Sequence, residues 1–127
     1  MAIPGLIRNF SCSTPVAANR FVAADGADFS CKQANGVGAA ILGATEQSSN
    51  DNHNRVDVVL TQSCPVEFAG NITAGDQVVA DASGKAVALD MAAYVDDAQV
   101  FVAGTALESG DAGVIGEIQL NPYLIVK

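Results

Sequence analysis

The sequence ITAGDQVVADASGKAVAL at residues 72–89 carries the clearest fold signal in the chain. Two short apolar runs flank the tetrapeptide Asp-Ala-Ser-Gly at residues 81–84. Asp hydrogen-bonds nearby backbone N–H groups and Gly accepts a positive φ, so these residues between Val-rich runs predict a β-hairpin. In the second run, Val87 and Leu89 alternate with alanines, which is the period of a strand. Nothing in this stretch indicates chemistry, so the hairpin is interpreted as scaffold.

The same pattern occurs earlier in the chain. Residues 17–26 (AANRFVAADG) resemble residues 74–84, and residues 42–48 resemble residues 103–109, at an offset that drifts from 57 to 61 residues. This similarity predicts an internal duplication in which a hairpin, a long strand, a polar loop and a closing strand occur twice. The alternative is that an all-β chain rich in Ala, Val and Gly resembles itself by chance.

The length of 127 residues is typical of one domain. Each repeat alone is near the lower size limit for its own core, so the two repeats are expected to share one. Many short strands at near-regular spacing predict an all-β fold, a small β-barrel or sandwich built from two similar hairpin-containing halves. The expected organisation is an extended N-terminal arm at residues 1–13, a β domain at 14–120 with repeats at about 15–62 and 71–120, and a C-terminal segment at 121–127.

The chain has few charged residues, and most of them are acidic. Charged residues make up 16% of the sequence and the net charge is −8, whereas a typical soluble domain has roughly 25% charged residues. Low charge suits surface that becomes buried in an assembly. The acidic balance opposes binding to phosphate groups, and no stretch approaches the length of a membrane span. We therefore expect no nucleic-acid partner and no membrane partner.

No arrangement of residues in the sequence indicates catalysis or metal binding. The single histidine, His53, lies in a polar loop, where no nucleophile or orienting group is expected beside it. Cys12, Cys31 and Cys64 are widely spaced and are expected to be reduced and mostly buried thiols. We therefore expect no catalytic residue, no metal and no cofactor, and we predict that the protein is not an enzyme.

Apolar residues near both ends are the candidate contact residues. The first 13 residues are either an arm that reaches a neighbouring subunit or a first strand that docks on its own core. At the other end, Asn121-Pro122 is expected to end a strand and to separate a second apolar segment. The residues expected to contact a partner protein or a sister subunit are Ile3, Pro4, Leu6, Ile7, Phe10, Tyr123 and Leu124.

Four segments resemble a known family. Residues 72–88, 102–113 and 114–120, together with GAAILGATE at 38–46, are similar to the head decoration, or capsid cement, proteins of tailed bacteriophages. The resemblance covers about residues 15–120. It implies an all-β homotrimer that sits on the outside of the head at three-fold or quasi-three-fold positions and bridges neighbouring subunits of the major capsid protein. It also implies synthesis in the host cytoplasm and a final location on the outer capsid surface of the virion.

A second function stays open from the sequence, namely a surface-exposed module of a phage particle that binds glycans or the host. Such sites usually present an exposed aromatic side chain, and few of the aromatic residues lie in expected loops.

Overall fold

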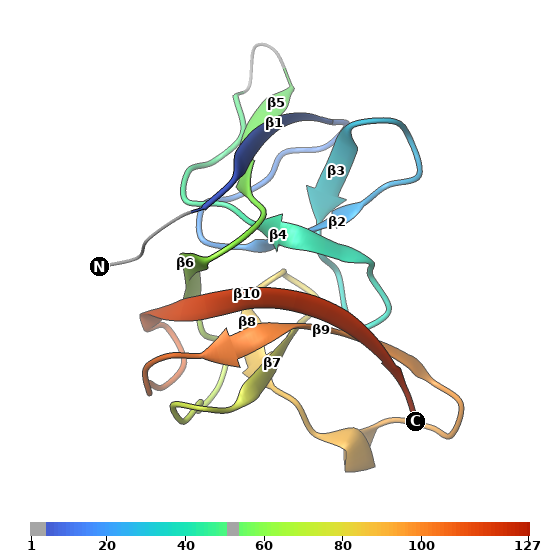
Figure 1. Cartoon of the computed structure of the whole chain (residues 1–127), viewed down its shortest axis with the longest axis vertical. Coiled ribbons are helices and arrows are strands. Elements are labelled where there is room, and N and C mark those ends of the chain that lie inside the picture. Colours follow the sequence, from blue (N-terminus) through green and yellow to red (C-terminus); the bar gives the residue numbers. More distant parts are fainter. Residues whose placement is uncertain (1–4, 51–53) are drawn as a thin grey trace.

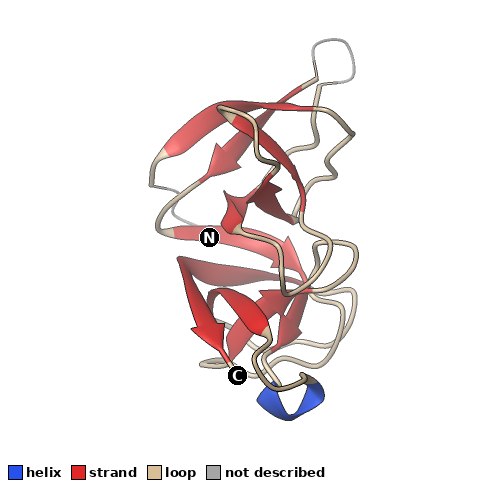
Figure 2. Cartoon of the chain, turned by 90° about the vertical axis from the view of Figure 1, so that its right-hand side faces the viewer, coloured by secondary structure: helices blue, strands red, loops and turns tan. Residues whose placement is uncertain are grey.

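The computed structural model describes residues 5–50 and 54–127 and is all-β, with one short 3₁₀ helix (Figure 1, Figure 2). This confirms the predicted fold class. The elements are β1 (Ile7–Cys12), β2 (Phe21–Ala24), β3 (Ser30–Gln33), β4 (Ile41–Ala44), β5 (Arg55–Val59), β6 (Ser63–Glu67), β7 (Gln77–Ala80), β8 (Ala86–Ala88), η1 (Met91–Ala93), β9 (Gln99–Ala106) and β10 (Ile115–Val126).

The two halves of the chain have the same strand order. The first half is a closed barrel in the order β1-β3-β2-β4-β5, and the second is a five-stranded sheet in the order β6-β10-β9-β7-β8. If β6 to β10 are matched in turn with β1 to β5, each neighbour relation of the second sheet has its counterpart in the first. A parallel β1–β3 pair closes the barrel, and a parallel bridge between Phe68 and Ala86 stands at the corresponding place in the second half. Figure 2 shows the two sets of strands stacked along the long axis of the molecule.

Backbone hydrogen bonds show which residues are equivalent in the two halves. Asn19 donates its N–H to the carbonyl of Thr45 at 2.9 Å, and Gly75 donates to the carbonyl of Ala106 at 2.8 Å. Both donors have a positive φ, 59° for Asn19 and 96° for Gly75. The alignment of residues 17–26 with residues 74–84 at an offset of 57 instead pairs Asn19 with Asp76, one residue further on. The structure therefore corrects that alignment by one residue at the start of each hairpin.

The hairpin predicted from residues 72–89 is present. Strands β7 and β8 pair antiparallel. Asp81 accepts hydrogen bonds from the backbone N–H groups of Ser83 at 2.8 Å and Lys85 at 2.9 Å, and Gly84 has a φ of +76°. The carbonyl of Gly84 also accepts a bond from the N–H of Phe21 at 2.8 Å. The turn is thus fixed against the first half of the protein.

Strand β1 occupies part of the expected N-terminal arm. It pairs antiparallel with β5 over five residues and parallel with β3 over two. Residues 7–12 therefore form the docked first strand, the alternative that the sequence left open. Phe10 and Cys12 point into the barrel, so pairing and burial together hold this segment in place. An arm could include only residues before Ile7, and residues 1–4 lie outside the described part of the chain.

Strand β10 continues through the expected break at Asn121-Pro122. Its pairing with β9 runs from Leu120 opposite Gly104 to Tyr123 opposite Val102, so three steps on β10 match two on β9. A bulge of this kind absorbs one extra residue and bends the strand without ending it. The segment 121–127 is therefore largely a continuation of the sheet rather than a separate segment, contrary to our expectation.

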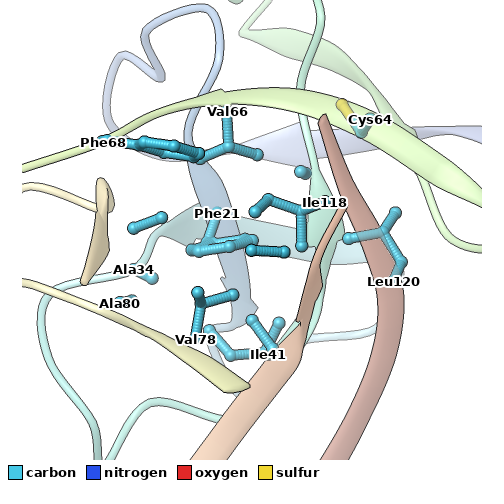
Figure 3. Packing of buried hydrophobic residues seen from close by; sticks show 14 of the residues in the cluster. Phe21, Ala34, Ile41, Cys64, Val66, Phe68, Val78, Ala80, Ile118 and Leu120 are labelled. Carbon is cyan, nitrogen blue, oxygen red and sulfur yellow. The ribbon is translucent and has the colours of Figure 1, made fainter. Parts of the chain in front are cut away.

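One hydrophobic core joins the two halves. Phe21, Ala23 and Ala44 of the first half belong to the same buried cluster as Phe68 and Ile118 of the second. Figure 3 shows Phe21 close to Ile118 and Val78, and Phe68 beside Val66. A smaller cluster fills the first barrel, and a third lies under the far end of β9 and β10. The fold therefore buries its largest side chains between the halves.

Candidate contact surfaces

The described residues before β1 lie against the linker between the two halves. Gly5 donates its N–H to the carbonyl of Thr61 at 3.1 Å, and Leu6 donates to the Thr61 hydroxyl at 2.8 Å. The carbonyl of Leu6 accepts a bond from Leu60 at 2.8 Å. A Cβ at position 5 would overlap the Thr61 side chain and the Cγ of Gln62, so only glycine fits there without displacement. The chain is held to the protein from Gly5 onward.

The candidate contact residues near the N-terminus differ in exposure. Leu6 is 58% exposed and Ile7 is 48% exposed, so both present apolar surface. Phe10 is only 7% exposed and packs with Cys12 and Val22 inside the first barrel. Phe10 is thus a core residue, and the sequence pattern could not separate it from its exposed neighbours. Ile3 and Pro4 lie outside the described residues.

Near the C-terminus both candidate residues are partly exposed. Tyr123 is 37% exposed and donates its hydroxyl to Oε1 of Gln77 at 2.9 Å. Leu124 is 46% exposed and lies opposite Phe101 of β9. Between them and the end of the strand, Ile125 packs on the third cluster. In this part of β10, Ile125 therefore packs against the protein, while Tyr123 and Leu124 expose apolar surface to solvent.

The linker brings segments from both ends of the chain together. Gly5 and Leu6 bond to Thr61, and the next residue, Gln62, accepts a bond from the N–H of Leu120 at 2.7 Å. Gln62 has a φ of 68°, which turns the chain between β5 and β6. The N-terminal residues and the middle of β10 thus flank a single turn, an arrangement that local sequence patterns do not reveal.

Other exposed apolar residues were not predicted from the sequence. Phe29 is 60% exposed and lies under the guanidinium of Arg8, whose Cζ is 4.3 Å from the ring centroid. A cation over an aromatic face is a favourable contact that also holds the ring in place. Further exposed apolar side chains are Val95, Leu107, Val114, Ile115 and Val126. A turn residue next to an apolar one, such as Gly113 before Val114, is the sequence feature that indicates exposure of the apolar residue.

Two adjoining hollows lie beside β1 and β5. One, of about 220 Å³, is lined by Ile7, Glu46, Gln47, Asp57 and Val59. The other, of about 350 Å³, shares Gln47 and Asp57 and is otherwise lined by Asn9, Ser48, Asn50, Arg55 and Val56. Asn9 links its walls, because its amide donates to Asp57 at 2.9 Å and its oxygen accepts from Arg55 at 2.5 Å. No aromatic side chain lines either hollow among the described residues.

A carboxylate between two cations connects the halves. Glu67 lies 3.2 Å from Nη1 of Arg20 and 2.9 Å from Nζ of Lys85. The hydrogen bond from Lys85 and the positive charge of Arg20 hold the pKa of Glu67 below its usual value. The backbone N–H of Glu67 also donates to Asn19 at 3.1 Å. These polar contacts therefore join the two halves in addition to the shared hydrophobic core.

The titratable groups of the described residues include three buried thiols but no cluster of metal ligands. No group of three or more His, Cys, Asp or Glu side chains that could hold a metal ion occurs in residues 5–50 and 54–127. Burial raises the pKa of the Cys31 thiol to about 11 and that of Cys64 to about 12, so both are unreactive at neutral pH. His53 lies outside the described residues. Within the described chain, no helix is long and apolar enough to cross a membrane.

No protein-family model matches the sequence, and no curated protein matches it. The fold is similar to the crystal structure of the head fiber gp8.5 N base in bacteriophage phi29. The TM-score is 0.67 at 18% sequence identity, and the similarity covers 91% of this chain and 93% of that chain. It therefore extends over both halves and their arrangement, and at this identity it shows a common fold.

Proposed function

We propose that this chain is a structural protein of a phage head that decorates the capsid surface and bridges neighbouring subunits of the major capsid protein. The observation that carries the proposal is the fold similarity, at a TM-score of 0.67, to the base of a phage head fiber. The resemblance of residues 15–120 to head decoration proteins supports the same class independently of the fold.

The surface properties agree with a binding role without catalysis. Leu6 and Ile7 expose apolar side chains on one side of the linker turn, and Tyr123 and Leu124 do so on β10. Hydrogen bonds hold Leu6 to Leu60 and Thr61 of the linker. Strand pairing holds Ile7 to β5 and holds Tyr123 and Leu124 to β9. A rigid apolar surface binds at lower entropic cost than a free arm would. We therefore propose Leu6 and Ile7 as the capsid contact and Tyr123 and Leu124 as a contact with a sister subunit, and we propose that the protein is not an enzyme.

The proposal includes a location and a set of partners. The protein would be made in the host cytoplasm and would act on the outer capsid surface of the virion, with the major capsid protein as its partner. It would act as a homo-oligomer, which the resemblance implies to be a trimer. It would need no cofactor, nucleic acid or membrane.

Localisation tests the class of protein. Antibodies against this chain should label the heads of purified phage particles in immuno-electron microscopy. Absence of the chain from purified particles would reject the proposal.

Binding to heads assembled without this protein tests the contact. Ile7→Asp should reduce co-sedimentation with such heads at least about tenfold, since it places a carboxylate in an apolar contact. Val95→Asp is a matched control, because Val95 is exposed on the opposite half. Equal binding by both variants and the unchanged protein would exclude the surface around Ile7. Phe10→Ala should instead unfold the protein, which thermal denaturation distinguishes from lost binding.

The second candidate is a surface-exposed module of a phage particle that binds glycans or the host. The observation that favours it is the pair of hollows, since amide and carboxylate groups line both and the guanidinium of Arg55 lines the second. The absence of aromatic lining residues in the described chain favours the capsid role over it. A glycan array with a specific hit that Asp57→Ala abolishes would reverse this preference.

A further inference from the structure

The distal part of β10 is an open sheet edge. Strand β6 pairs with Ile115–Gln119 of β10, and the N–H of Leu120 still finds a partner in the carbonyl of Gln62. Beyond Leu120, β10 pairs with β9 on one side only, and no described strand covers its other side. Figure 1 shows β10 running past the end of β6 toward the C-terminus. Asn121, Pro122, Tyr123 and Leu124 are all exposed, which agrees with an uncovered edge.

The backbone groups at this edge can be assigned a direction. Leu124 is opposite Phe101, and Phe101 donates its N–H to Val37 at 2.8 Å, on the side of β9 away from β10. In an antiparallel pair the two residues either exchange bonds or both point away, so the N–H and C=O of Leu124 point outward. Alternation gives Val126 and Pro122 the same direction. The missing N–H of Pro122 therefore removes no bond from the β9 ladder.

The side chains at this edge give it little protection. Natural edge strands usually carry charges, prolines or bulges that prevent pairing with another chain. Residues 118–126, IQLNPYLIV, contain no charged side chain in a protein of net charge −8. Pro122 and the neighbouring bulge are the features of this edge that oppose pairing with another chain, and both precede Tyr123. Leu124 and Val126 are 46% and 59% exposed.

We propose that two copies of this chain pair antiparallel along the outer edge of β10, with Leu124 opposite the same residue of the second copy. In this register Leu124 exchanges two backbone bonds with its counterpart. The N–H of Val126 donates to the carbonyl of Pro122 in the second copy. By the two-fold symmetry, the N–H of Val126 in the second copy donates to the carbonyl of Pro122 in the first. Pro122 accepts this bond but has no N–H to return one, so the carbonyl of Val126 has no donor on the opposite strand.

The side-chain pairs across the seam favour a second copy over another occupant. With Leu124 on the two-fold axis, Tyr123 lies opposite Ile125 of the second copy, and Pro122 lies opposite its Val126. All of these pairs are apolar, and an aromatic residue opposite a β-branched one is a favourable cross-strand pair. Two copies with eight net negative charges each would repel elsewhere, but the seam itself brings no carboxylate against another.

The contact is two-fold and forms a dimer, which departs from the trimer that the resemblance to decoration proteins implies. It depends on the fold and not on attachment to a capsid. The test therefore uses the purified protein alone, and its outcome is separate from that of the binding experiment above.

Sedimentation equilibrium of the full chain should give twice the mass of 12.9 kDa. Leu124→Lys should raise the dimer dissociation constant by about tenfold or more, because two like charges would lie directly opposite each other. Leu107→Lys is the matched control, since Leu107 has a similar exposure of 48% and lies away from this edge. A monomeric or trimeric mass, an unchanged constant in Leu124→Lys, or an equal loss in Leu107→Lys would overturn the proposal.

Cross-linking provides a second measurement that does not rely on a destabilising change. Cys12, Cys31 and Cys64 are buried, so Leu124→Cys would add the accessible thiol of the folded protein. Its oxidation with copper phenanthroline should yield a covalent dimer, whereas Leu107→Cys should not. A covalent dimer in both variants or in neither would contradict the proposed register.

Discussion

Gly43 of β4 and Gly104 of β9 occupy the same position in the two halves. Gly43 faces the carbonyl of Val59 on β5, and Gly104 faces the carbonyl of Gln119 on β10. In both cases the backbone of the next strand fills the space that a Cβ would need. Neither glycine has a positive φ, so close approach of strands is the reason for glycine at both sites.

Gly104→Ala should destabilise the protein by about 1–3 kcal/mol, because the added methyl group overlaps backbone that cannot move aside. Gly38→Ala is the control, since a Cβ at Gly38 has no neighbour within 4 Å. Urea unfolding followed by circular dichroism measures both. Equal stability of the two variants would show that the strands separate easily at Gly104.

Phe21→Ala should lower the stability of both halves together. Phe21 is fully buried in the shared core, and removing a buried aromatic side chain costs about 3–5 kcal/mol. Both tyrosines, Tyr94 and Tyr123, lie in the second half, so tyrosine fluorescence reports on that half. The fluorescence transition should move to lower urea together with the circular dichroism transition. A fluorescence transition that stays in place would mean that the halves unfold independently.

Acid should weaken the contact between Glu67 and its two cations. Since the folded state lowers the pKa of Glu67, its contribution to stability is present above the ordinary glutamate pKa and is lost as the pH falls through the folded value. The ion pairs are partly exposed, so we expect a loss of about 1 kcal/mol or less. Thermal melts between neutral pH and about pH 3 should show a smaller pH dependence in Glu67→Gln than in the unchanged protein. The same pH dependence in both would exclude this carboxylate as a source.

Thiol reactivity should follow unfolding. Cys31 and Cys64 are fully buried, and burial raises the pKa of both thiols, to about 11 and about 12. At pH 8 a disulfide reagent should therefore react with them only in molecules that have opened. Raising the urea concentration should accelerate labelling in step with the unfolded fraction. Rapid labelling of either thiol in native buffer would indicate local opening.

The local features of the fold could be predicted, and the contacts between distant segments could not. The Asp81–Gly84 turn follows from Asp and Gly chemistry that acts within four residues. The sequence groups Phe10 with the candidate contact residues because an isolated apolar strand does not show which face the barrel covers. The sequence predicts a strand end at Asn121-Pro122, since it does not show that a neighbouring strand continues to pair beyond a proline. The linker turn accepts hydrogen bonds from Gly5 and Leu6 at Thr61 and from Leu120 at Gln62. No local sequence pattern reveals these contacts between distant segments.

The shared core also bears on how such a protein arises. A chain of half this length with the same strand order would expose the surface that Phe21 and Ile118 cover. Two such chains would have to associate to bury that surface. Each half of the chain therefore corresponds to one subunit of a dimer. The linker around Gln62 joins the two halves and makes the contact between them intramolecular.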